Sequence, residues 1–390
     1  MKKIKMSLLA MAVLSASTLS AEALNFEKNY TIADEMKIDG QVRLNFESND
    51  VKDNASKRAT ALTNRLLINT YWSPSKLKNT TVKASFLNVS SLVDNYNISN
   101  DTSPKYDSVD NPTQTRISEL NMTVNYPKQD TSLTIGRQTL ELADGRFISN
   151  ADENQMYRSF DSIYIQNETV EDLKLSAFYS TKTLTETEAT SKNDIAFVNL
   201  DYTMLDDMVN VSLFDIMAED VNDIVGTKIG VKTGVRGAEV NVTGQLAYQM
   251  DATLGNSDVS GDKFYELGAN VSYQNVTVGM DYTVQEEGFV NTYGNKTNFN
   301  GFANAVTGDN LETFKTYVGY ETPKMGNFKI AYLDFNEEKS GTDLGTEIDL
   351  SWDYDIAKNL NVMAKGGVYD KDNATTMDTS RYMVQLDYRF

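Results

Sequence analysis

The chain ends on Arg381-Tyr382-Met383-Val384-Gln385-Leu386-Asp387-Tyr388-Arg389-Phe390, a stretch in which apolar and polar residues alternate. Counted back from Phe390 in steps of two, every residue is aromatic or aliphatic, whereas the interleaved positions are mostly polar. This alternation predicts a β-strand with one apolar face and one polar face that contacts water. Taken alone, the stretch fits both the edge strand of a soluble sheet and the closing strand of a membrane barrel.

The N-terminal residues have the pattern of an export signal. Three lysines among the first five residues precede an uncharged run, Met6–Leu19, which is too short to span a bilayer as a helix. Small residues follow and offer cleavage sites after Ala21 or Ala23. We therefore predict a signal peptide over residues 1–21, a short periplasmic lead-in over residues 22–37, and an exported mature chain.

The alternation recurs from residue 38 to residue 390 and predicts a single all-β transmembrane barrel of about eighteen antiparallel strands, with sixteen as the alternative. The connections between these strands alternate in length along the chain. Short connections include residues 73–76, 127–130, 234–237 and 274–275, and long ones include residues 47–58, 90–113, 141–157, 249–261 and 284–310. Tight turns on one side and long loops on the other are typical of a barrel in the bacterial outer membrane.

Aromatic residues follow the direction of the predicted strands. Strands that run toward short turns end in Trp72, Tyr126, Tyr202, Tyr273, Tyr320, Tyr354 and Phe390. Strands that run toward long loops carry Phe46, Phe86, Tyr179, Tyr248, Tyr282 and Tyr332 near their outer ends. Such rings prefer the boundary between lipid chains and water at each membrane surface. The pattern therefore predicts two aromatic belts and favours the membrane barrel over a soluble sheet.

Composition argues against enzymatic chemistry. The chain contains no His and no Cys, which removes imidazole bases, thiolate nucleophiles and disulfides. Outer-membrane barrels that are enzymes rely on a catalytic His, and no phosphate-binding glycine loop is present. The formal net charge of -19 argues against nucleic acid as a partner. We expect no catalytic residue, no cofactor and no enzymatic activity, and the lipid bilayer and small hydrophilic solutes as partners.

A barrel of this size leaves an aqueous channel that its wall side chains alone cannot fill. The best candidate for narrowing it is an inward loop over residues 141–157, which mixes apolar and charged residues. The predicted constriction residues in it are Glu141, Asp144, Arg146, Asp152 and Glu153. Alternation places basic residues on lumen-facing or rim positions of the first strands: Arg43, Arg65, Lys83, Arg116, Arg137 and Arg158. We expect an acidic loop opposite a basic wall, with a transverse field between them.

Later strands place both signs of charge toward the lumen. The predicted lumen acids are Asp201, Glu239, Glu266, Asp281, Glu347, Asp349 and Asp353, and the lysines are Lys228, Lys232, Lys315, Lys329 and Lys365. Together with the net charge, this predicts a mild preference for cations or zwitterions. Acidic runs such as Asp206-Asp207 offer oxygen ligands for Ca²⁺, although such runs more often form a solvated loop surface, and we predict no metal site.

Several stretches resemble the Opr-type and major-outer-membrane-protein porins of the Campylobacter group: Ile38–Arg43, Ile135–Leu140, Arg158–Ile163 and Val170–Tyr179. The resemblance implies a passive diffusion channel, commonly trimeric. It also implies that the terminal Tyr388 and Phe390 belong to the signal read by the outer-membrane assembly machinery. Alginate-export barrels share part of the pattern, but here the inward loop lacks a tryptophan and arginines are few.

The sequence therefore predicts an outer-membrane porin for passive diffusion of ions and small hydrophilic solutes. Three alternatives stay open. The first is a substrate-specific channel for amino acids or carboxylates. The others are an alginate-export-like conduit and a non-conducting adhesin barrel.

Overall fold

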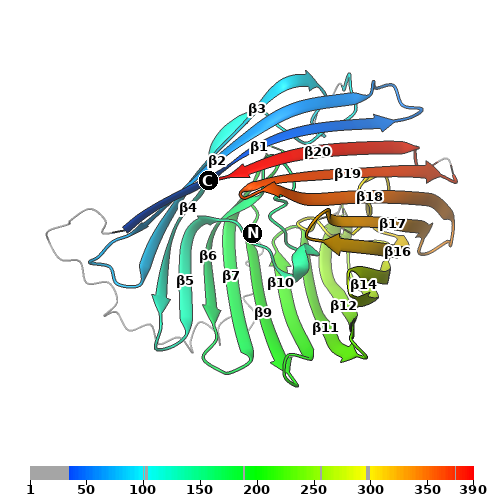
Figure 1. Cartoon of the computed structure of the whole chain (residues 1–390). Helices are drawn as coiled ribbons and strands as arrows, with labels where there is room; N and C mark the ends of the chain where they lie inside the picture. Colours follow the sequence, from blue (N-terminus) through cyan, green and yellow to red (C-terminus); the bar gives the residue numbers. More distant parts are fainter. Residues whose placement is uncertain are drawn as a thin grey trace.

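The structure is a computed structural model that describes residues 35–99, 101, 104–187, 189–254, 257–295, 299–373 and 375–390. Within these residues, eighteen long strands form a closed antiparallel barrel (Figure 1). Two further strands, β8 (Thr190–Ser191) and β13 (Ser257–Val259), are short pieces inside loops, and η2 (Ala143–Gly145) is a single 3₁₀ turn. The predicted all-β barrel and its strand number are confirmed.

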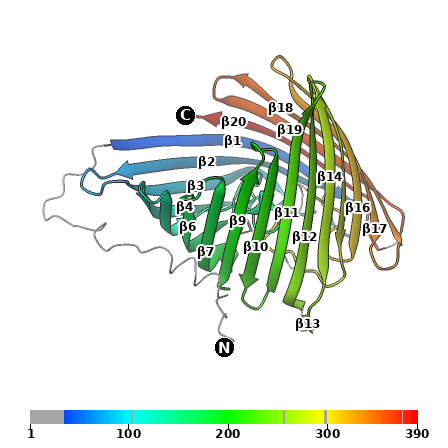
Figure 2. The ribbon, with the colours of Figure 1, turned by 90° about the horizontal axis from the view of Figure 1, so that it is seen from below.

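The first half of the barrel consists of β1 (Glu35–Val51), β2 (Ala59–Ser73), β3 (Thr80–Asn95), β4 (Gln114–Tyr126), β5 (Thr131–Gln138), β6 (Ser159–Asn167), β7 (Leu173–Leu184), β9 (Ile195–Met204) and β10 (Val209–Ala218). The second half consists of β11 (Asn222–Val235), β12 (Ala238–Leu254), β14 (Lys263–Tyr273), β15 (Val276–Gln285), β16 (Leu311–Thr322), β17 (Gly326–Glu337), β18 (Asp343–Ala357), β19 (Leu360–Lys371) and β20 (Thr379–Arg389). Figure 2 shows these strands following one another around the ring.

The barrel closes where the last strand meets the first. Leu44 of β1 lies opposite Leu386 of β20, and the pairing extends from Gln41 to Val51 on the first strand. Beyond it, the backbone N–H of Gly40 donates to the carbonyl of Phe390 at 2.9 Å, and the Phe390 N–H donates back at 3.0 Å. Closure leaves the sheet without an open edge, which a bilayer requires because its core offers no hydrogen-bond partners.

The alternation in sequence separates the two faces of the barrel wall: apolar residues face outward and polar residues face the lumen. On β1, Val42 and Leu44 are 42% and 39% exposed on the outer face, whereas Arg43 and Asn45 are 4% and 1% exposed on the lumen side. An apolar outer band of this kind suits contact with lipid chains, and the aromatic rings predicted for both belts lie on this outward face. The predicted outward orientation of these rings is therefore confirmed, while the two belts at the membrane interfaces stay a prediction.

The N-terminal prediction needs a correction at its boundary. Strand β1 begins at Glu35, three residues before the predicted start, because the alternation continues outward through exposed Met36 and Ile38. The predicted signal peptide and the remainder of the lead-in lie outside the described residues.

The loops confirm the predicted asymmetry, but two predicted long connections, residues 47–58 and 249–261, are shorter than expected because β1 continues to Val51 and β12 to Leu254. On one side the strands are joined by turns of a few residues, such as Gln274-Asn275 between β14 and β15. On the other side three long connections, residues 96–113, 139–158 and 286–310, project from the barrel wall. Long loops mark the outer side of such barrels and short turns the periplasmic side. No helix among the described residues is long and apolar enough to cross a membrane.

Candidate functional site

The loop between β5 and β6, residues 139–158, crosses the lumen, and we call it the constriction loop. One part of it is held by the wall at β1 and β2. The Arg65 guanidinium lies 3.0 Å from the Asp152 carboxylate and donates at 3.0 Å to the Asn154 carbonyl. Arg43 donates at 3.0 Å to the Asp152 carbonyl. Charged donors thus satisfy backbone carbonyls that a loop inside a barrel would otherwise leave unpaired.

The same loop reaches the opposite wall. Asp144 pairs with Lys228 of β11, and Arg146 pairs with Glu266 of β14. The Arg146 guanidinium also lies over the ring of Phe264, 5.0 Å from its centroid. Because β11 stands half-way around the ring from β1, these contacts show that the loop spans the barrel (Figure 1).

An apolar cluster fixes the middle of the constriction loop. Phe147 is buried with its ring centroid 5.4 Å from Phe214, 5.5 Å from Phe264 and 6.1 Å from Phe289. Ile148 beside it is fully buried. Burying large side chains within the barrel stabilises the inward conformation by about 1.5–3 kcal/mol per side chain. The loop is therefore a packed part of the fold.

A second loop, residues 286–310 between β15 and β16, lies against the first and contributes to the constriction. The Ser149 N–H donates to the Tyr293 carbonyl at 2.9 Å, and the Asn295 N–H donates to the Gly145 carbonyl at 2.9 Å. At Gly294, a Cβ atom would fall 2.0 Å from a backbone oxygen, so the two loops approach as closely as only glycine permits. The two loops therefore pack together as one unit inside the barrel.

Two neighbouring carboxylates of β18 pin the second loop to the wall. Glu347 accepts a hydrogen bond at 2.7 Å from the Ala303 N–H, and Asp349 accepts one at 3.1 Å from the Phe302 N–H. The Phe302 ring sits between two cations, 4.8 Å from the Arg381 guanidinium and 5.7 Å from the Lys365 ammonium. We call Glu347, Asp349 and Phe302 the loop latch.

Two members of the predicted basic wall, Arg43 and Arg65, face the constriction loop instead of open water. Arg43 forms a buried ion pair with Asp387 at 2.8 Å. Arg65 is 1% exposed. These two arginines therefore anchor the loop, which corrects the expected transverse field at this point, since the opposite charges are in contact. Their residual charge is shielded from a passing solute.

The other predicted wall residues have different partners. Lys83 pairs with Glu119 across β3 and β4, and Arg116 donates to the Tyr157 carbonyl. Arg158 pairs with Glu186 at 2.8 Å. Burial raises the pKa of the Tyr157 phenol well above its ordinary value, so the hydroxyl stays protonated.

Arg137 does not lie on the lumen wall. It stands in register with Leu120 of β4, whose side chain is exposed on the outer face. Two N–H groups of Arg137 bind the Asp161 carboxylate at 2.7 and 3.0 Å, and a third donates to the Ile117 carbonyl at 3.0 Å. Ile135, two residues earlier, is exposed on the same outer face, and the pairing of β4 with β5 is unbroken. Alternation itself therefore places Arg137 on the outer side, and its assignment to the basic lumen wall is wrong.

The predicted constriction acids divide into paired and open groups. Glu153 pairs with Lys365 at 3.3 Å. Asp144 and Asp152 keep 67% and 57% of their side chains exposed despite their ion pairs. Glu141 is exposed. Burial lowers the pKa of the Arg146 guanidinium, an effect that the Glu266 carboxylate opposes.

A second charged region occupies the lumen face of β15 to β17, and we call it the lysine wall. It consists of Lys315, Lys329 and Asp281. Lys315 stands in register with Asp281. The Lys329 ammonium lies 4.1 Å from the centroid of the Tyr317 ring, and this lysine is exposed to the lumen. Alternation predicts that all three charged residues face the lumen. The contact of Lys329 with the Tyr317 ring was missed, because only charged lumen positions were considered.

The loop latch was also missed in part. Alternation placed Glu347 and Asp349 in the lumen, but nothing in their spacing indicated that they bind backbone groups of a distant loop. Residues 286–310 were recognised only as a long connection. The signal available was the four aromatic residues, Phe289, Tyr293, Phe299 and Phe302, in a loop otherwise rich in Asn and Gly. The described residues contain no group of three or more potential metal ligands.

Comparisons with known proteins identify the fold. No family model and no curated protein matches the sequence. Among solved structures, the chain is similar to the outer membrane protein OpdK of Pseudomonas aeruginosa, with a TM-score of 0.72 and 14% identity over 92% of this chain and 100% of that one. OpdK was also solved with vanillate, and that structure gives a TM-score of 0.73 at 14% identity, with the same coverage of both chains.

Another similar structure is a BenF-like porin from Pseudomonas fluorescens Pf-5, with a TM-score of 0.70 and 10% identity over 92% of this chain and 100% of that one. These likenesses cover the whole barrel, whereas the resemblance to porins of the Campylobacter group stays a prediction. The chain has the fold of eighteen-stranded outer-membrane porins, and its apolar outer band places it in the bacterial outer membrane.

Proposed function

We propose that the chain is a porin that selects small hydrophilic solutes bearing a carboxylate, amino acids among them. The lysine wall is the observation that carries this proposal. Lys329 is exposed to the lumen and forms no ion pair among the described residues, while Asp281 lies beside Lys315 on the same wall. A solute carboxylate finds cations there, and the ammonium of an amino acid finds Asp281.

Passage on this account is passive. The constriction loop and the second loop narrow the lumen, so that a solute must move along the remaining wall. Charged groups on that wall replace part of the water that the solute loses, which lowers the barrier for solutes of matching charge. Flux follows the solute gradient, with no covalent step and no cofactor.

The structural neighbours support this class of solute. OpdK was solved with vanillate, which is a carboxylate. The BenF-like porin shares the same fold. General diffusion, with a mild preference for cations, is the second candidate, and the strongly acidic composition favours it. In that case the lysine wall is part of a channel that separates solutes by size and does not bind carboxylates.

Liposome swelling separates the two candidates. Vesicles with the purified barrel are diluted into isotonic solutions of neutral sugars, amino acids and monocarboxylates of graded size. Selectivity predicts that carboxylate-bearing solutes enter faster than neutral solutes of equal size, and that their flux saturates. General diffusion predicts a smooth decline with size alone. A barrel that shows no swelling with any solute supports the non-conducting alternative.

Trimeric assembly is a further part of the proposal, and it rests on the sequence resemblance. Cross-linking of the detergent-purified protein, followed by mass measurement of the intact assembly, tests it. A mass three times that of the monomer is expected, and a monomer under all conditions contradicts it.

A further inference from the structure

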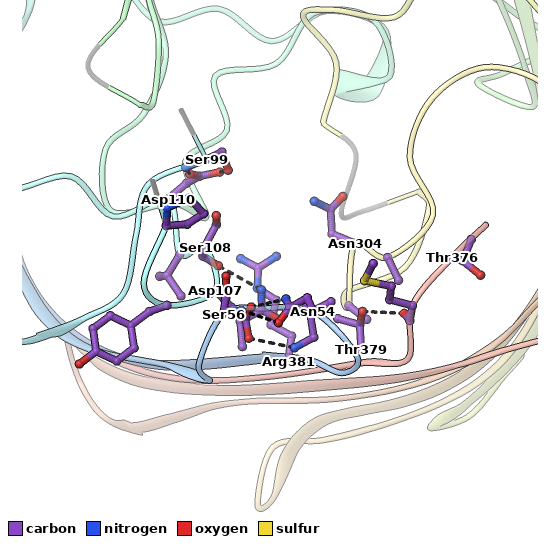
Figure 3. A pocket seen from close by; sticks show the side chains of 18 of the residues that line it. Asn54, Ser56, Ser99, Asp107, Ser108, Asp110, Asn304, Thr376, Thr379 and Arg381 are labelled. Carbon is purple, nitrogen blue, oxygen red and sulfur yellow. Dashed lines mark hydrogen bonds between the residues drawn. The ribbon is translucent and has the colours of Figure 1, made fainter. Parts of the chain in front are cut away.

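The outer mouth of the barrel holds a cavity of about 500 Å³ above β1 and β20 (Figure 3). Four segments build its wall: the end of β1 with the loop after it, the loop between β3 and β4, the second loop near Asn304, and the start of β20 with the residues before it. The volume falls within the range of roughly 300–1,000 Å³ typical of small-molecule sites. The second loop of the constriction thus forms one wall of this cavity, and the other walls come from loops and strand ends on the outer side of the barrel.

The charged side chains of the cavity are already bound by the protein. Arg381 donates to the Glu47 carboxylate at 2.8 Å. Asp107 accepts from the Val51 N–H at 3.0 Å and from the Asn54 amide at 2.7 Å. Asp110 likewise accepts hydrogen bonds from the backbone N–H and the hydroxyl of Ser99, at 2.9 and 2.8 Å. A charged ligand could bind Arg381, Asp107 or Asp110 only by displacing the protein groups that already bind them.

What remains for a ligand is neutral and polar. The hydroxyls of Ser56 and Ser108 and the side-chain amide of Asn304 have no hydrogen-bond partner among the described residues. Figure 3 shows Asn304 reaching into the cavity from one side and Ser108 facing it from the other, with Ser56 below. A hydroxyl and an amide each donate and accept hydrogen bonds, as the alcohol groups of a sugar do.

We propose that this cavity binds small neutral polyhydroxylated solutes of the sugar class, and we call it the vestibule site. It is formed by loops on the outer side, so a ligand reaches it from that side without passing the constriction. The proposal goes beyond carboxylate selectivity and does not depend on it, because the lysine wall shares no residue with the vestibule site.

Single-channel recording in a planar bilayer tests the site with sucrose as the probe. Sucrose is added to the outer or to the periplasmic side while the ionic current is recorded. Outer addition is expected to give brief closures whose frequency saturates with concentration. Periplasmic addition at the same concentration is expected to give far fewer closures, since the constriction stands between the probe and the site.

Ser108→Ala combined with Asn304→Ala removes two unengaged groups. Loss of two hydrogen bonds is expected to raise the half-saturating sucrose concentration about tenfold. Thr375→Ala is the matched control, because its hydroxyl already donates to Asn373 within the same wall. This control should leave the sucrose response within about twofold of the parent value. Ser108→Ala alone keeps the test usable if the double variant folds poorly, because Asn304 has a φ of 53°, a left-handed conformation that Ala disfavours.

Closures that are equal from both sides, that do not saturate, or that survive in the double variant would overturn the vestibule site. The carboxylate flux of the same variants separates this outcome from failure of the proposed function. Loss of sucrose closures with unchanged carboxylate flux supports the site. If the parent channel shows no carboxylate selectivity but still closes saturably with sucrose, only the proposed solute class is contradicted.

Discussion

The guanidinium of Arg65 lies 3.0 Å from the carboxylate of Asp152, and this pair joins the wall of β2 to the loop that crosses the channel. The arginine is fully enclosed while the aspartate keeps more than half of its side chain in water. The contact therefore positions the constriction loop from a rigid strand, and the exposed side of Asp152 faces the lumen.

Removing this anchor should loosen the loop. Arg65→Ala deletes the charged hydrogen bonds to Asp152 and to the Asn154 carbonyl, so we expect a loss of about 2 kcal/mol in stability. We also expect larger open-channel current noise. Thermal unfolding in detergent and single-channel recording measure the two effects. Lys174→Ala is the control, because its pair with Glu168 is exposed at 3.6 Å and contributes under about 1 kcal/mol. Equal noise in both variants would refute the anchoring role.

The lysine wall should control ion selectivity. Lys329→Gln removes a positive charge that is exposed to the lumen, so the channel should favour cations more strongly. In a KCl gradient, the reversal potential should move toward the potassium equilibrium potential, with a change of about twofold in the permeability ratio. Lys324→Gln, in a periplasmic turn, should shift it less. A reversal potential identical to that of the parent would exclude Lys329 from the permeation path.

The loop latch should hold the second loop against the wall. Glu347→Gln and Asp349→Asn together weaken the acceptors of the Ala303 and Phe302 N–H groups, so the loop should detach more often. We expect more frequent transitions between conductance levels in single-channel traces. Asp353→Asn changes a lumen carboxylate of the same strand that accepts a hydrogen bond from Asn361 in the wall. It should leave gating unchanged, and steady currents in the latch variant would contradict the latch.

The terminal residue should matter for assembly more than for conductance. The Phe390 ring covers Gly40 so closely that a Cβ there would lie 2.6 Å from it. Deleting Phe390 also removes both backbone hydrogen bonds to Gly40. We expect a lower yield of folded barrel, read from the mobility of unheated protein in gel electrophoresis, with normal conductance for the barrels that insert. Phe390→Tyr should assemble normally, and normal assembly of the deletion would show that the signal lies elsewhere.

The sequence predicts the barrel well because one physical rule governs each strand. Val42 and Arg43 must face lipid and lumen respectively, so their alternation is visible without any partner. The rule is interrupted where strands carry bulges, as between Ser85 and Phe86 of β3. Loop contacts such as Phe302 with Asp349 join residues far apart in sequence, and no local pattern encodes them.

The most direct test of the account is the flux of a carboxylate through the parent channel and through a Lys315→Gln, Lys329→Gln variant. Single-channel current in sodium benzoate is compared with current in sodium chloride as the benzoate concentration rises. The account predicts that benzoate current saturates in the parent and becomes proportional to concentration in the variant, while barrel assembly is unchanged. Benzoate current that rises linearly in both proteins, in step with its diffusion coefficient, would contradict selection by the lysine wall.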